Sequence, residues 1–143
     1  MTNGGLAGIY LFKAEKRLKI LSVLLEEEDY SDVVREAQEI VELALKGALR
    51  FVGIDPPKYH DVSSMLMQHR ERFPALSQEV LQRLSGISKR LRKERELSFY
   101  GDIDFIPTEE YSREDAQQAI EEATFVVQTV KGLLGDWKGT TCD

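Results

Sequence analysis

Cysteine, histidine and proline are scarce in this chain of 143 residues, and the first two shortages exclude whole classes of site. The one cysteine, Cys142, cannot form a disulfide within the chain, and the Cys and His spacing of a zinc site is absent. The two histidines, His60 and His69, do not have the spacing that places two metal ligands together on a helix. We therefore expect a cytoplasmic protein with a reduced thiol, no metal site and no cofactor.

Long apolar runs and an excess of positive charge are also missing. No stretch approaches the roughly 20 apolar residues of a membrane span, and we expect neither a signal peptide nor contact with a membrane. The formal net charge is −6, so any contact with nucleic acid has to come from a local basic patch and not from the surface as a whole. The length and the 42% apolar content suit one globular domain over residues 1–143.

Helical periodicity is present along nearly the whole chain and is clearest between residues 31 and 53. Ser31 or Asp32 is expected to cap the start of this helix, and Gly53 to take the left-handed conformation after its last turn. Its apolar row, with steps of three and four, consists of Val33, Ala37, Ile40, Val41, Ala44, Ala48 and Phe51.

Similar patterns predict three more long helices, over residues 6–28, 76–98 and 113–135. A short helix is expected to start after Asp61, and Ser112 with Asp115 resembles a capping box at the start of the last helix. Strand signals are weak throughout, and the segment FYGDIDFIP is expected to be an ordered loop. The fold class is therefore all-α, an up-and-down bundle of four long helices plus one short helix.

The segment KRLRKERELSFYGD, residues 89–102, places five cations within seven positions of an acidic chain. The apolar row of this helix consists of Val80, Leu84, Ile87 and Leu91, with steps of four, three and four, and the next step of four is Arg95. Because an unpaired buried guanidinium is costly, Arg95 should reach a carboxylate or face a cleft. Lys89, Arg90 and Lys93 are expected on solvated faces, where they also complement the helix dipole.

Two long segments resemble the HEPN domain, a family of small helical bundles, and the resemblance covers nearly the full length. They are AQEIVELALKGALRFVGIDPPKYHDV and LRKERELSFYGDIDFIPTEEYSREDAQQAIEEATFVVQTV, the second similar to the prokaryotic branch. The motif of the family is an Arg, a polar spacer of four to six residues and a His at the end of the third long helix. Arg95 matches the Arg and Glu96 the polar position after it, but Tyr100 stands where the His would be, and no His follows Arg95.

The resemblance implies a homodimer, with metal-independent RNA cleavage in the active members of the family. A Tyr with a pKa of about 10 is ionised in only roughly one molecule per thousand at pH 7, so it replaces a His poorly in proton transfer. We therefore expect the cleft to bind nucleotide, phosphate or RNA with little cleavage. The binding residues expected there are Arg92, Arg95, Glu96, Tyr100 and Asp102.

Many members of the family are paired with a small nucleotidyltransferase, and such pairs resemble toxin–antitoxin systems. This implies a possible transferase partner, with Tyr100 as the acceptor of an adenylyl group. One alternative is a weak metal-independent endoribonuclease that uses Arg95 with Tyr100 or His60 as the catalytic pair. Another is a purely structural oligomerisation bundle. In it, the Arg95 guanidinium pairs with the carboxylate of Glu96, Asp102 or Asp104 of its own or a neighbouring subunit.

Overall fold

The computed structural model describes residues 3–56, 61–100 and 111–135, and for residues 3–4 and 94–100 it describes the backbone alone. These ranges contain helices and no strand, so the predicted bundle of four long helices and one short helix is confirmed. The elements are α1 (Asn3–Glu26), α2 (Tyr30–Phe51), α3 (Val62–Gln68), a 3₁₀ turn (Arg70–Arg72), α4 (Gln78–Tyr100) and α6 (Arg113–Leu133).

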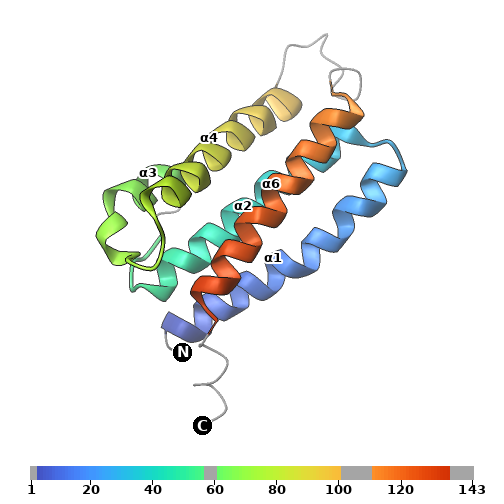
Figure 1. Cartoon of the computed structure of the whole chain (residues 1–143). Coiled ribbons are helices and arrows are strands. Elements are labelled where there is room, and N and C mark those ends of the chain that lie inside the picture. The colour runs from blue at the N-terminus through green and yellow to red at the C-terminus, as the bar shows by residue number, and fades with distance from the viewer. Residues whose placement is uncertain (1–2, 57–60, 101–110, 136–143) are drawn as a thin grey trace.

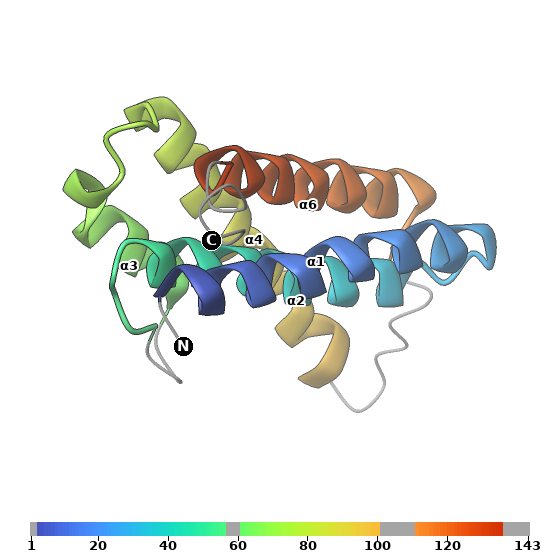
Figure 2. The same ribbon diagram turned by 90° about the horizontal axis from the view of Figure 1, so that it is seen from below.

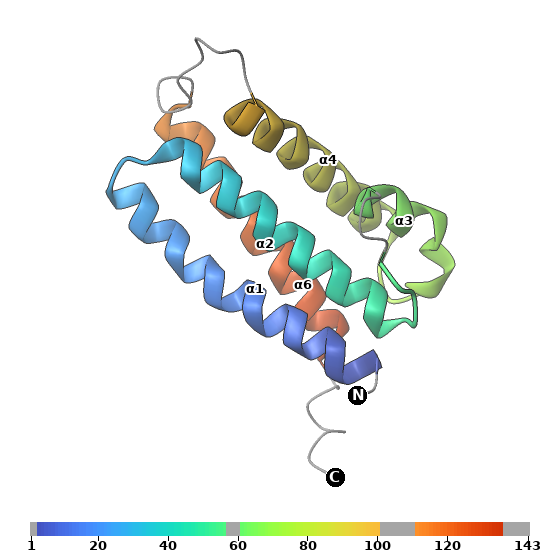
Figure 3. The ribbon, with the colours of Figure 1, turned by 180° about the vertical axis from the view of Figure 1, so that it is seen from behind.

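The long helices run alternately up and down (Figure 1). α1 and α2 lie side by side, and α6 covers the pair from one side (Figure 2). α4 lies along α2 on the side away from α1, and α3 packs against the first half of α4 (Figure 3). The last turns of α4 therefore lie at the end of the bundle where α2 and α6 begin. None of the helices in the described part of the chain is both long and apolar enough to cross a membrane.

α2 is the central helix, because it packs against α1, α3, α4 and α6. Its predicted apolar row is buried except for Phe51, which is partly buried. Gly53, with a φ of 84°, takes the left-handed conformation that the sequence predicts after this helix. The buried row of α2 thus faces helices on both sides, which makes it the axis of the core.

Gly47 marks the closest approach of α1 to α2. A Cβ added to Gly47 would lie 3.1 Å from the Cβ of Tyr10 and 3.2 Å from the carbonyl oxygen of Ala7. Both distances are shorter than ordinary van der Waals contact between such atoms. The absence of a side chain at this position is therefore what allows the two helices to lie so close together.

The start of α2 differs from the prediction that Ser31 or Asp32 caps it. The helix begins at Tyr30 with Asp29 as its N-cap residue, Ser31 is buried, and Asp32 is paired with Arg35. The reason is the tight turn that ends α1, in which Glu28 takes a φ of 59°. The amides of Glu28 and Asp29 donate to the carbonyl oxygens of Leu25 and Leu24 at 3.0 and 2.9 Å, so the chain turns within these residues and α2 starts earlier than its polar residues suggest.

Asp29 provides a test of this turn, because its pKa is raised above the ordinary value of 3.8. The main cause is a side-chain hydrogen bond with Asp32, followed by burial and by the charge of Asp32. The folded state therefore holds a proton on Asp29 more tightly than the unfolded chain does. The stabilisation is complete below pH 3.8 and is lost as the pH rises through the folded pKa.

Asp29→Asn is accordingly expected to raise the free energy of unfolding at pH 7 by less than about 1 kcal/mol, since the pair is partly exposed. The gain should vanish in acid, where the wild-type Asp29 is itself protonated. Urea unfolding at several pH values between about 3 and 7 measures both effects. A gain of equal size at every pH would contradict the proposed hydrogen bond.

The start of α6 has the capping box that the sequence predicts. The Ser112 hydroxyl accepts a hydrogen bond from the Asp115 amide at 3.1 Å, and the Ser112 amide donates to Asp115 Oδ2 at 3.0 Å. Ser112→Ala is expected to lower the free energy of unfolding by about 1 kcal/mol. Ser22→Ala is the matched control, because the Ser22 hydroxyl only donates to an exposed carbonyl within α1. Equal effects of the two changes in thermal unfolding would argue against the cap.

Candidate functional site

α4 carries four of the five predicted binding residues on one continuous helix. It ends at Tyr100, two residues later than predicted, and therefore includes Arg92, Arg95, Glu96 and Tyr100. Asp102 lies outside the described residues, as does His60. The fold thus brings Arg92, Arg95, Glu96 and Tyr100 to the same end of one helix.

The buried row of α4 leads directly to Arg95. Leu84, Ile87 and Leu91 are buried as predicted, while Val80 is only partly buried. The backbone of α4 continues without interruption past Leu91, so Arg95 is placed one helical step of four after the last buried leucine. The prediction that Arg95 continues the core-facing row therefore stands at the level of the backbone.

Arg92 is the one predicted binding residue whose side chain the structure describes. Its Nη1 lies 3.8 Å from Oδ1 of Asp61, and about 41% of the Arg92 side chain is exposed. Asp61 is the N-cap of α3, as predicted, and accepts hydrogen bonds from the amide and hydroxyl of Ser63. At 3.8 Å the Arg92 pair is loose, so the guanidinium keeps donors that can reach a bound anion.

A second contact holds the start of α3 against α4. The Ser85 hydroxyl donates to the carbonyl oxygen of Ser63 at 3.3 Å in a buried position. Together with the Arg92–Asp61 pair, this fixes the first turn of α3 beside α4. Arg95 follows Arg92 by three residues, a rise of about 4.5 Å along the helix. The contact of Asp61 with Arg92 is therefore made by a residue of α4 that lies about one turn before Arg95.

Arg90 corrects one part of the prediction for the basic segment. It was expected on a solvated face, but it forms an ion pair with Glu122 on α6 and is only partly exposed. Arg83 makes a further link to α6, with its guanidinium carbon 3.7 Å from the ring centre of Phe125. Lys89 and Lys93 are exposed, as expected. Part of the positive charge of α4 thus serves to attach this helix to α6.

Acidic residues and histidines do not gather into a metal site in the parts of the chain that the structure describes. At roughly 100° per residue, Lys89 and Lys93 lie on other sides of α4 than the Arg95 position, whereas the partly exposed Arg92 lies nearer to it. The guanidinium of an arginine such as Arg92 is a type of group that binds phosphate oxygens well.

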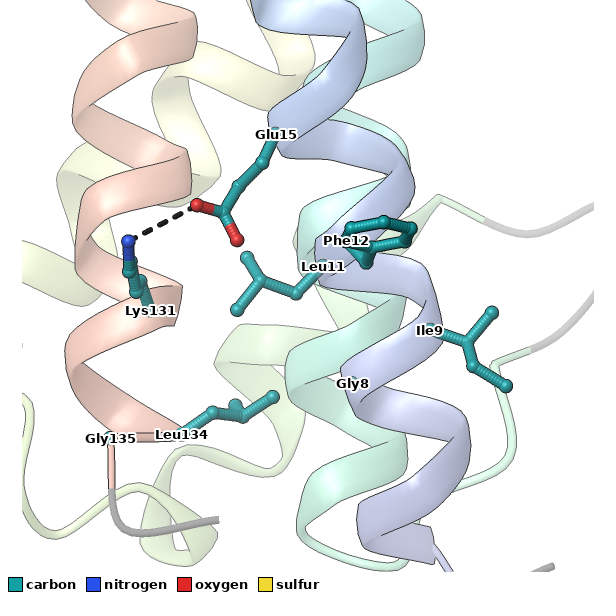
Figure 4. Close-up of a pocket in the computed structure, with 8 residues that line it drawn as sticks. All are labelled: Gly8, Ile9, Leu11, Phe12, Glu15, Lys131, Leu134 and Gly135. Atoms are coloured by element: carbon teal, nitrogen blue, oxygen red, sulfur yellow. Dashed lines mark hydrogen bonds and ion pairs between the residues drawn. The ribbon is translucent and has the colours of Figure 1, made fainter. Parts of the chain in front are cut away.

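A second concave surface, which the sequence reasoning missed, lies between α1 and α6 at the other end of the bundle. It has a volume of about 350 Å³, and the side chains of Ile9, Leu11, Phe12 and Leu134 line it (Figure 4). The ion pair of Lys131 with Glu15, 3.2 Å long, connects the two helices beside it. Its signal in the sequence is that apolar residues occur on more than one side of α1.

The fold and the α4 end together define a small all-α bundle with an arginine-centred candidate site. Residues 7–133 match the sequence model of the HEPN domain, a span that includes most of α1 and all of α2, α3, α4 and α6. The chain belongs to the HEPN domain family, which confirms the resemblance found in the sequence.

One relative is similar over almost the whole chain. It is a protein of Methanocaldococcus jannaschii with the name "Putative toxin MJ1304", and it is 26% identical over 140 residues. The similarity covers 93% of this chain and 91% of that protein. The two proteins thus match over nearly their full lengths and not over a single motif.

Proposed function

We propose that this chain is a toxin-type HEPN protein that binds RNA or a nucleotide at an Arg95-centred cleft of a homodimer, without efficient RNA cleavage. The observation that carries the proposal is the position of Arg95 on α4, one step after the buried Leu91 and one turn after Arg92. Membership of the HEPN family and the toxin name of the relative support it. A single domain over residues 1–143 and a cytoplasmic location belong to the same proposal.

The chemistry of the proposed cleft follows from the types of residue that the proposal assigns to it. The planar guanidinium of Arg95 can hold two oxygens of one phosphate, and Arg92 can add a further donor. Glu96, Tyr100 and Asp102 complete the proposed binding set. The two carboxylates can accept hydrogen bonds from sugar and base, and the Tyr100 hydroxyl can donate or accept one. Tyr100 is a poor proton carrier near neutral pH, so bound RNA stays intact.

Binding is the direct test, with a fluorescent ATP analogue and a short labelled RNA at one fixed salt concentration. Arg95→Ala is expected to weaken binding of at least one probe by at least about tenfold, the loss of one charge-assisted phosphate contact. Lys93→Ala is the matched control, because Lys93 is an exposed cation on the same helix and should change affinity by about twofold or less. No binding by the wild type, or equal loss in both variants, would refute the proposal.

The structural alternative makes a different prediction for the same variant. If Arg95 only pairs with carboxylates at an interface, Arg95→Ala lowers stability or dissociates an oligomer, and neither probe binds the wild type. Sedimentation velocity of wild type and variant separates the two cases.

The proposed partner is a small nucleotidyltransferase that modifies Tyr100. The Tyr100 oxygen would attack the α-phosphorus of ATP, form a phosphodiester, release pyrophosphate and pass its proton to solvent. The added phosphate would then pair with the Arg95 guanidinium and block the cleft. A mass gain of one adenylyl group on the Tyr100 peptide, absent in Tyr100→Phe, is the expected result, and no gain with an active transferase would count against it.

A weak ribonuclease is the second candidate, and the contact of Asp61 with Arg92 favours it. His60 directly precedes Asp61 in the chain, so a histidine is attached to the residue that meets α4 one turn before Arg95. Under this reading, wild-type protein cleaves RNA in the presence of a chelator, and both His60→Ala and Arg95→Ala abolish the cleavage. Under the main proposal the wild type does not cleave, whereas Tyr100→His, which restores the family motif, gains activity.

A further inference from the structure

α1 exposes apolar side chains on the face that points away from the bundle. Ile9, Phe12, Ile20 and Val23 are between 43% and 57% exposed, and within the described residues these are the exposed large apolar side chains. The opposite face of α1 is buried against α2 and α6. α1 is therefore apolar on two faces, and packing within this chain accounts for only one of them.

The exposed residues form one row. At roughly 100° per residue, positions 9, 12, 20 and 23 fall within an arc of about 80°. The row borders the 350 Å³ cavity between α1 and α6, since Ile9 and Phe12 belong to both (Figure 4). Two apolar pairs on one helix face, Ile9 with Phe12 and Ile20 with Val23, with a hollow beside the first pair, have the form of a surface that accepts another helix.

Lysines accompany the row. Lys13, Lys16 and Lys19 are exposed, Lys16 lies within the arc and the other two lie on either side of it. The Lys16 ammonium is 4.7 Å from the ring centre of Phe12, and among the described residues none of the three lysines is in an ion pair. α1 thus presents an apolar row with unpaired positive charge, although the chain as a whole has a net charge of −6.

We propose that the outward face of α1 binds a helix of a second protein, one that presents an apolar row flanked by carboxylates. The lysines select against a second copy of this chain, because pairing two α1 helices would place the same lysines against one another. A membrane fits less well, because the hollow is concave and an anionic bilayer repels a protein of net charge −6. RNA is a poor occupant of this face, because it would pair with the lysines but leave the apolar side chains exposed to water. The inference does not rest on any role of Arg95.

The position of this face adds a functional consequence. α1 and α4 lie on opposite sides of α2 (Figures 1 and 3). A partner on α1 therefore leaves the Arg95 end of α4 uncovered. The partner and the proposed RNA or nucleotide can bind to one molecule at the same time.

A pair of synthetic helices tests the proposal on the full chain. The first is a labelled peptide of roughly 20 residues with leucine at every third or fourth position and glutamate on both sides of this row. The second has lysine in place of each glutamate. In fluorescence anisotropy at fixed salt, the glutamate peptide is expected to bind at least about tenfold more tightly than the lysine peptide.

Two sets of substitutions locate the binding on α1. Phe12→Ser together with Ile20→Ser should weaken the binding of the glutamate peptide by at least about tenfold. Lys13→Glu, Lys16→Glu and Lys19→Glu together should reverse the preference in favour of the lysine peptide. All five positions are exposed, so circular dichroism should show the helical content unchanged. Lys93→Glu on α4 is the matched control and should leave peptide binding as it is.

Several results would overturn the proposal. The first is equal binding of the two peptides, or no binding of either. The second is a wild-type dimer that dissociates when Phe12→Ser and Ile20→Ser are introduced. The third is that the wild type floats with anionic phosphatidylserine vesicles and that the same double change abolishes this flotation. Trp137 follows α6 in the sequence. If the peptide bound only to Trp137→Ser, this face would be assigned to the C-terminal segment of this chain. Arg95→Ala should bind the glutamate peptide normally, so failure here and failure of the proposed function can be told apart.

Discussion

Gly47→Val is expected to lower the free energy of unfolding by about 2–3 kcal/mol. Even the first carbon of a side chain at this position would meet the Cβ of Tyr10 at 3.1 Å and the carbonyl oxygen of Ala7 at 3.2 Å. The two further methyl groups of valine cannot be placed unless α1 moves away from α2, and α1 contributes Ala7, Leu11, Ala14 and Leu21 to the core. Urea unfolding followed by circular dichroism measures the loss.

Gly86→Ala is the matched control for this change. Gly86 is exposed in the middle of α4, and no atom lies within 4 Å of a Cβ added there. Its replacement should raise the free energy of unfolding by about 0.5–1 kcal/mol, because alanine is a better helix former than glycine. If Gly47→Val were as stable as the wild type, the close approach of α1 to α2 would be wrong.

Leu91→Ala is expected to cost about 2–5 kcal/mol of stability and to weaken ligand binding as well. Leu91 has no exposed surface and is the last described buried side chain of α4 before Arg95. Its truncation leaves a cavity under the turn that leads to the proposed site. The angle at which α4 presents Arg95 is then no longer held by packing.

Leu84→Ala separates the two effects of this change. Leu84 is 1% exposed, so its truncation should cost a similar amount of stability. It lies two turns earlier on α4, however, and should leave the affinity of the folded protein for the ATP analogue or RNA within about twofold. Binding measured well below the unfolding midpoint decides the question. Equal losses of affinity would mean that Leu91 acts through stability alone.

The sequence predicts the fold well because its signals are local. The row of α2 repeats every three or four residues with few interruptions, and Ser112 with Asp115 forms a cap within a single turn. The start of α2 is less predictable. It depends on the left-handed Glu28 in the turn before it, a conformation that glutamate rarely adopts and that no pattern indicates.

The candidate site is predictable only in part, because two of its contacts join residues far apart in the chain. The step from Leu91 to Arg95 can be counted along one helix, and the backbone of α4 bears it out. The partners of Arg90 and Arg92, Glu122 and Asp61, depend on how α4 lies against α6 and α3. No periodicity within α4 contains that information.

The outward face of α1 was missed for a different physical reason. When apolar residues occur on two faces of a helix, the contrast between faces is small and periodicity cannot tell which face is buried. Only the positions of α2 and α6 show that Ile9, Phe12, Ile20 and Val23 remain exposed.

The same face has a consequence during synthesis on the ribosome. α1 leaves the ribosome before the other helices of this domain and can pair with α2 once α2 has emerged. Its outward row is then already displayed, while Arg95 has not yet emerged from the ribosome. A partner that recognises this row would meet each new molecule before its candidate site exists. Such a partner would also cover apolar surface at the stage when a nascent chain is most prone to aggregate.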